Sequence, residues 1–108
     1  MKIILNDLPK ISLNKWYSGE HWSKRKKLKD KYKLLIKSQF KQVLSKDKTY
    51  EVEYTFNFKT RPLDASNCVA MVKLIEDVIF EDDNYKIVES IKIKSRKAKF
   101  DSVEIEVH

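Results

Sequence analysis

The sequence predicts an α+β domain in which two main helices pack on a small mixed β-sheet, in the order strand, helix, strand, helix, strand, strand. Three observations predict it. Apolar and polar side chains alternate with a period of two over residues 50–59. Apolar side chains recur at steps of three and four over residues 22–41 and 64–80, as in amphipathic helices. Two further alternating stretches, residues 91–94 and 103–107, come last.

Length and composition are typical of one domain, residues 1–108. The 108 residues are 42% hydrophobic and 36% charged, which suits a single core, and one glycine and two prolines leave no long flexible linker. Cys68 falls among apolar neighbours and is expected in that core. No signal peptide or membrane-spanning run is visible, so we expect a cytoplasmic protein with no membrane partner. The lysine-rich composition and small size suit a phage or prophage gene, and therefore a bacterial or phage-infected cell.

The first half of the chain begins with a short expected strand, residues 2–5, and continues into a basic helix. The formal net charge of the chain is +7, and this helix accounts for all of that excess. Its basic residues, set against the single acid Asp30, are Lys24, Arg25, Lys26, Lys27, Lys29, Lys31, Lys33, Lys37 and Lys41. Such a band favours a polyanionic partner, with nucleic acid first and an anionic membrane surface second. The alternative is a solvated face that contacts nothing.

Three aromatic residues, Trp16, Tyr17 and Trp22, immediately precede or open this helix. They are candidates for stacking on bases or ribose. Aromatic residues at the boundary of an element also commonly anchor it to the core, so both interpretations stay open.

In the second half, the alternating strand over residues 50–59 ends at Arg61 and Pro62, because proline lacks a ladder donor. Asp64 or Ser66 is then expected to cap a helix that runs to about Phe80. The last two strands are expected to be joined by a turn near residues 99–101.

Acidic residues surround the second helix although the chain is basic: Asp64, Glu76, Asp77, Glu81, Asp82 and Asp83. A helix of this length spans roughly 22 Å, so Asp64 and Asp83 meet only if the next strand folds back beside residues 50–59. Clustered carboxylates suit Mg²⁺, which prefers oxygen ligands. The alternative is a helix cap, a solvated helix face and an acidic turn, all of which are common.

The segment resembles the RusA family of Holliday junction resolvases, or crossover junction endodeoxyribonucleases. The family pattern is approximately D-x-D-N, a helix bearing K-x-x-x-D, and a D-D pair before a strand. The matching stretches are "DASN" from Asp64, "KLIED" from Lys73 and "EDDNYKIV" from Glu81. The beginning of the chain is similar to the family's P-x-S-x-N-x-x-W opening, and the matching residues are Pro9, Ser12, Asn14, Trp16, Ser23, Lys24 and Tyr32.

The resemblance implies a RusA-like homodimer that binds four-way DNA junctions and resolves them by paired symmetric nicks, with Mg²⁺ as cofactor and Mn²⁺ as a substitute. The implied catalytic residues are Asp64, Asp83, Lys73 and Asp77. The implied metal ligands are Asp64, Asp83, Asp82 and Asp77, with Ser66 and Asn67 in support. The expected DNA-binding residues are Asn14, Lys15, Trp16, Lys24, Arg25, Lys26, Lys27 and Arg61.

Two departures from the family pattern concern the metal site. Ser66 stands where the family has its second aspartate, and a hydroxyl is a poorer ligand for Mg²⁺ than a carboxylate. The interval from Asn67 to Lys73 is about three residues longer than in the family; Asp77 lies on the same helix stripe and is a candidate replacement ligand. The alternatives are a junction-binding protein with weakened catalysis and a protein-interaction domain whose charge only steers association.

Overall fold

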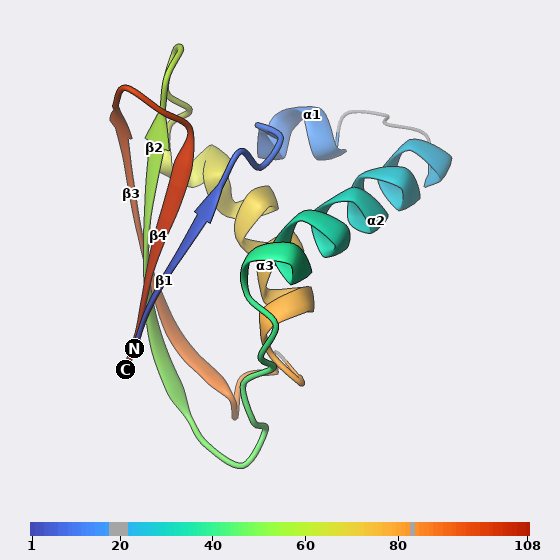
Figure 1. Ribbon diagram of the computed structural model, residues 1–108, viewed down its shortest axis with the longest axis vertical. Helices are drawn as coiled ribbons and strands as arrows, with labels where there is room; N and C mark the ends of the chain where they lie inside the picture. Colours follow the sequence, from blue (N-terminus) through green and yellow to red (C-terminus); the bar gives the residue numbers. More distant parts are fainter. Residues whose placement is uncertain (18–21, 83) are drawn as a thin grey trace.

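A computed structural model of the chain describes residues 1–17, 22–82 and 84–108 (Figure 1). The elements are β1 (Lys2–Asn6), α1 (Leu13–Tyr17), α2 (Trp22–Gln39), β2 (Tyr50–Phe58), the 3₁₀ turn η1 (Ala65–Cys68), α3 (Val69–Ile79), β3 (Val88–Lys97) and β4 (Ser102–Val107). The predicted α+β class and element order are confirmed, and α1 and η1 are additions to it. The strand order is β1-β4-β2-β3, with β2 and β3 parallel and the other pairs antiparallel, so the sheet is mixed.

The helices all lie on one face of the sheet, as Figure 1 shows. The alternation in β2 produces this arrangement, because Val52, Tyr54 and Phe56 point toward the helices and are almost fully buried. From α3, Met71 and Ile75 pack into the same core. None of the described helices is both long enough and apolar enough to cross a membrane.

The opposite face of the sheet carries a row of polar side chains that follows the strand order. The Glu104 carboxylate on β4 lies 3.3 Å from the Lys2 ammonium on β1 and 2.9 Å from the Arg96 guanidinium on β3. Between Glu104 and Arg96, the Asn57 amide on β2 donates to Glu104 at 3.0 Å and accepts from Arg96 at 2.7 Å. Hydrogen bonds from Asn57 and Lys2 lower the pKa of Glu104.

The two main helices begin and end at somewhat different residues from those predicted. α2 ends at Gln39 rather than Lys41, and the Gln39 amide exchanges hydrogen bonds of 2.6 and 2.9 Å with the backbone of Asn6 in β1. α3 begins at Val69 because the preceding four residues form η1. The prediction that Asp64 or Ser66 caps this helix is wrong, because Asp64 precedes η1 and makes no capping hydrogen bond, Ser66 lies inside η1, and the residue before α3 is Cys68.

The segment from β2 to β3 forms a β-α-β unit whose direction controls the site. Tyr50 pairs with Val88 at one end of the parallel strands and Phe58 pairs with Lys97 at the other. η1 therefore lies at the end of the sheet where the C-terminal ends of β2 and β3 meet. The Ser95 hydroxyl on β3 donates to the Leu63 carbonyl there. The C-terminal end of α3 lies at the opposite end of the sheet, where both strands start.

Candidate nucleic-acid interface

α2 packs its apolar stripe on α3 and β1 and exposes its lysines. Tyr32 and Ile36 are fully buried, and the Tyr32 hydroxyl donates to the Pro9 carbonyl. The exposed basic side chains of this helix are Lys24, Lys26, Lys27, Lys29, Lys31 and Lys33. Lys26 forms an i,i+4 ion pair with Asp30 at 3.4 Å, and both side chains are largely in solvent. The predicted cationic face is therefore present.

Five of these six lysines form two rows, because a helix turns about 100° per residue. Lys29 and Lys33 lie on the side toward α3 and line a shallow pocket with Leu74, Asp77 and Val78. Lys24, Lys27 and Lys31 lie on the other side, and we call them the α2 lysine row. Because Lys24 also lines a groove between α1 and α2, this row starts where that groove opens.

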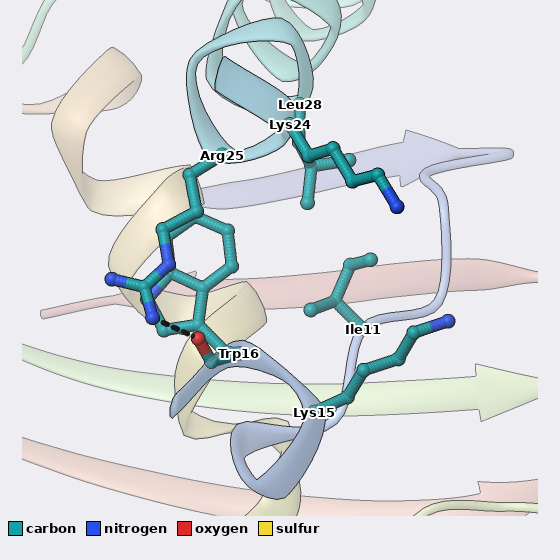
Figure 2. Close-up of a pocket in the computed structure, with 6 residues that line it drawn as sticks. All are labelled: Ile11, Lys15, Trp16, Lys24, Arg25 and Leu28. Carbon is teal, nitrogen blue, oxygen red and sulfur yellow. Dashed lines mark hydrogen bonds between the residues drawn. The ribbon is translucent and has the colours of Figure 1, made fainter. Parts of the chain in front are cut away.

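The groove has an accessible volume of about 270 Å³ and lies between the two helices and the segment before α1. Its lining residues, drawn in Figure 2, are Ile11, Lys15, Trp16, Lys24, Arg25 and Leu28. The Arg25 guanidinium stacks 5.3 Å from the centre of the Trp16 ring and donates to the Trp16 carbonyl. The groove thus combines apolar walls with three cationic side chains.

The other predicted DNA-binding residues divide between this region and the far end of β2. Asn14 and Lys15 are exposed on α1, next to the groove. Arg61 is exposed in the loop after β2, where its carbonyl accepts a 2.5 Å hydrogen bond from Lys10. Residues 18–21 and the side chains of Tyr17 and Trp22 are outside the described part of the structure, so Trp16 is the one of the three aromatic candidates whose side chain is described.

Ile11 and Leu28 were missed as site residues. Leu28 belongs to the apolar stripe of α2 and was therefore assigned to the core, and Ile11 stands alone between Lys10 and Ser12 in the sequence. Only the packing of α1 against the start of α2 turns these side chains into the wall of a groove.

The first of the predicted metal ligands, Asp64, is exposed just before η1. Its charge acts on the Cys68 thiol, which is fully buried, as predicted. The pKa of Cys68 is raised to about 11, mainly by burial; a hydrogen bond with Ser95 lowers it and the nearby charge of Asp64 raises it. Of the two supporting residues, Ser66 is exposed within η1 and Asn67 is partly buried.

Lys73 and Asp77 are both exposed on α3 but border different hollows. Lys73 lines a groove between α3 and β3, with an accessible volume of about 310 Å³, and Asp77 lies in the pocket that faces α2. Glu76 borders the groove with Lys73; it is 8% exposed, and its carboxylate accepts a 3.1 Å hydrogen bond from the Tyr54 hydroxyl. Glu76 was not predicted as a site residue, although it is the buried carboxylate of this helix.

Asp82 follows α3 at the other end and accepts a 3.1 Å hydrogen bond from the Asn84 amide. Asp83 lies outside the described residues. η1 contains 4 residues and α3 contains 11, so these two elements separate Asp64 from Asp82 by roughly 20 Å.

The strand after Asp83, β3, does run beside β2, but parallel to it. The start of β3 therefore lies at the opposite end of the sheet from Asp64. The structure therefore does not bring Asp64 and Asp82 together within one chain. Within residues 1–17, 22–82 and 84–108, no group of three histidine, cysteine or acidic side chains is placed to hold a metal ion.

Comparison of the chain with protein-family models gives no match, and neither does comparison with curated proteins.

Proposed function

We propose that this protein binds branched DNA and is a RusA-like endonuclease that nicks four-way junctions with Mg²⁺ as cofactor. The observation that carries the DNA-binding part is the one-sided charge of α2, where six exposed lysines face a single acid of that helix. Like charges so close together repel one another, and a polyanion relieves that repulsion. The cleavage part is supported by the order of the RusA-like motifs in the sequence.

The α2 lysine row matches the spacing of phosphates along DNA. Lys24 and Lys31 are seven residues apart, which is roughly 10 Å along the helix axis. Phosphates of one strand advance about 3.4 Å each along a duplex, so this length covers about three of them. Three lysines on one row are thus suited to contacting successive phosphates of one strand, which positions the DNA without reading its sequence.

The cleavage part of the proposal requires two copies of the chain. The groove between α3 and β3 is bordered by apolar Val69, Val72 and Ile91 and by the oppositely charged Lys73 and Glu76. Such a surface is self-complementary when two copies meet about a two-fold axis with their α3 helices antiparallel.

If Lys73 of one copy faces Glu76 of the other, each residue i of α3 lies level with residue 149 − i of the second copy, so Val69 lies level with Phe80. Asp64, which precedes η1, is then expected at the end of the interface where α3 of the second copy leads into Glu81 and Asp82. A symmetric homodimer of this kind brings together carboxylates that one chain holds apart, and it forms two equivalent sites for two nicks.

The second candidate function is junction binding without cleavage. Two observations favour it: the separation of Asp64 from Asp82 in one chain, and the exposed hydroxyl of Ser66 where the family pattern has a carboxylate. In this case, DNA affinity depends on the basic residues alone and neutralising Asp64 changes nothing but charge.

The first test is cleavage of a labelled four-way junction and a linear duplex of the same sequence, in Mg²⁺, Mn²⁺ or EDTA. We expect paired nicks in the junction with either metal, loss of cleavage in Asp64→Asn with junction affinity retained, and normal cleavage in the control Glu53→Gln, an exposed acid on the open face of the sheet. Tight binding of the junction with no cut under any metal overturns the nuclease proposal and supports the second candidate. No binding overturns both.

Mixing two inactive variants tests the two-copy site. A heterodimer of Asp64→Asn with Asp83→Asn has one site that carries both substitutions and one that carries neither. We therefore expect the mixture to recover cleavage, mainly as single nicks rather than paired ones. If each site lies within one chain, every site in the mixture is altered and no cleavage returns.

A further inference from the structure

We infer that the groove between α1 and α2 holds one unpaired nucleotide of the bound DNA, with its base against the apolar wall and its phosphate between Lys15 and Lys24. This inference rests on the proposed DNA binding and adds the structural feature of the DNA that is recognised. It does not depend on whether the DNA is cut.

The shape of the groove suits a single nucleobase. Ile11, Trp16 and Leu28 provide apolar surface, and the accessible volume of about 270 Å³ lies just below the range of sites for drug-sized molecules. A paired base cannot reach such a site, because its faces are covered by neighbouring base pairs and its edge faces its partner. The groove therefore selects a base that has left the stack, at an energetic cost that is smallest where DNA is already unpaired.

The aromatic wall of the groove is fixed before any ligand binds. Arg25 stacks on Trp16 and donates to its carbonyl, so α2 holds the position of the indole on α1. The Nε donor of Arg25 is buried and finds no acceptor among the described residues. Because this Nε atom is covered by neighbouring atoms, a ligand in the groove does not reach it, and Arg25 acts through the indole that it holds in place.

The cationic side chains lie where the phosphate of such a nucleotide would be. Figure 2 shows the ammonium groups of Lys15 and Lys24 on the same open side of the groove, on either side of Ile11 and away from the pair of Trp16 and Arg25. Lys24 is also the first member of the α2 lysine row. A strand that leaves the groove can continue along that row, so the unpaired nucleotide is expected at the point where a paired arm begins.

The experiment compares two duplexes that differ only by one base. Both carry a single bulged nucleotide, which is adenine in one duplex and an abasic sugar in the other, so their phosphate charges are identical. We expect the wild-type protein to bind the adenine bulge about tenfold more tightly, which is within the range for stacking one base on an aromatic side chain. Binding of a 2-aminopurine bulge is expected to quench its fluorescence.

Three variants identify the groove as the cause. Trp16→Leu, which keeps an apolar side chain, is expected to bring the affinity ratio of the two duplexes close to one. The double variant Lys15→Ala with Lys24→Ala weakens binding of both duplexes. The control Lys29→Ala with Lys33→Ala, on the other side of α2, retains the tenfold ratio.

Circular dichroism confirms that each variant is folded before its affinity is measured. Equal affinity of the wild type for the two bulges, with no quenching, overturns the inference and leaves the proposed DNA binding intact. A ratio that survives Trp16→Leu likewise overturns it, because the base then binds elsewhere. Failure of the wild type to bind any of these DNAs or a four-way junction overturns the proposed function itself.

Discussion

Neutralising two members of the α2 lysine row should change how strongly DNA binding depends on salt. Each phosphate contact releases condensed counterions and contributes about 0.9 to the slope of log affinity against log salt concentration. Three contacts from Lys24, Lys27 and Lys31 give a slope of about −2.7, so affinity falls about 40-fold between 50 and 200 mM salt. With Lys27→Ala and Lys31→Ala, one contact remains and the fall is only about 3.5-fold.

The matched control for this prediction is Lys29→Ala with Lys33→Ala. It removes the same two charges from the same helix but from the side that faces α3, so the net charge changes equally, from +7 to +5. Fluorescence anisotropy of a labelled junction, titrated at four salt concentrations, gives both slopes. We expect the control to keep a slope close to that of the wild type. Equal reductions in the two variants would refute a contact row, since they would mean that only net charge matters.

Three further predictions concern the fold. Glu104 has a pKa below its ordinary value of 4.5, so its interactions with Asn57 and Lys2 stabilise the protein above that pH and are lost as the pH falls through the lowered pKa. Glu104→Gln should therefore lower the free energy of unfolding in urea at pH 7, and that free energy should fall less on acidification than it does in the wild type. An equal loss of stability on acidification in both proteins would contradict this. The Cys68 thiol, buried and with its pKa raised to about 11, should resist a thiol reagent at pH 8 until the protein unfolds, and rapid labelling of the native protein would contradict that burial. Ile75→Ala should lower the free energy of unfolding by about 2–5 kcal/mol in urea, because Ile75 is fully buried in α3; a loss below 1 kcal/mol would contradict its place in the core.

The local patterns of the sequence predict most of the elements. The alternation over residues 50–59 predicts β2 almost residue for residue, because period two directly reflects one buried and one exposed face. α1 was missed because five residues carry too little periodicity to mark a helix. The start of α3 was placed too early, since Ser66 and Asn67 are typical of helix starts but lie in a 3₁₀ turn here.

The arrangement of the site was harder to predict than its residues. Trp16, Lys24 and Arg25 were predicted as DNA-binding residues because aromatic and basic side chains cluster in the sequence, and the structure gathers them in one groove. The relation of Asp64 to Asp82 depends on whether β3 runs parallel or antiparallel to β2. That choice follows from how α3 crosses the sheet, and no local pattern in either strand encodes it.

The polar row on the open face of the sheet also makes its two outer strands depend on each other. Lys2 on β1 and Arg96 on β3 both bind the Glu104 carboxylate, although β1 and β3 are opposite edges of the sheet with β4 and β2 between them. When the Glu104 carboxylate leaves this position, β1 and β3 each lose an ion pair at the same time. The backbone amides of these two edges are therefore expected to exchange with solvent in concert, so that the sheet opens as one cooperative unit rather than fraying separately from each side.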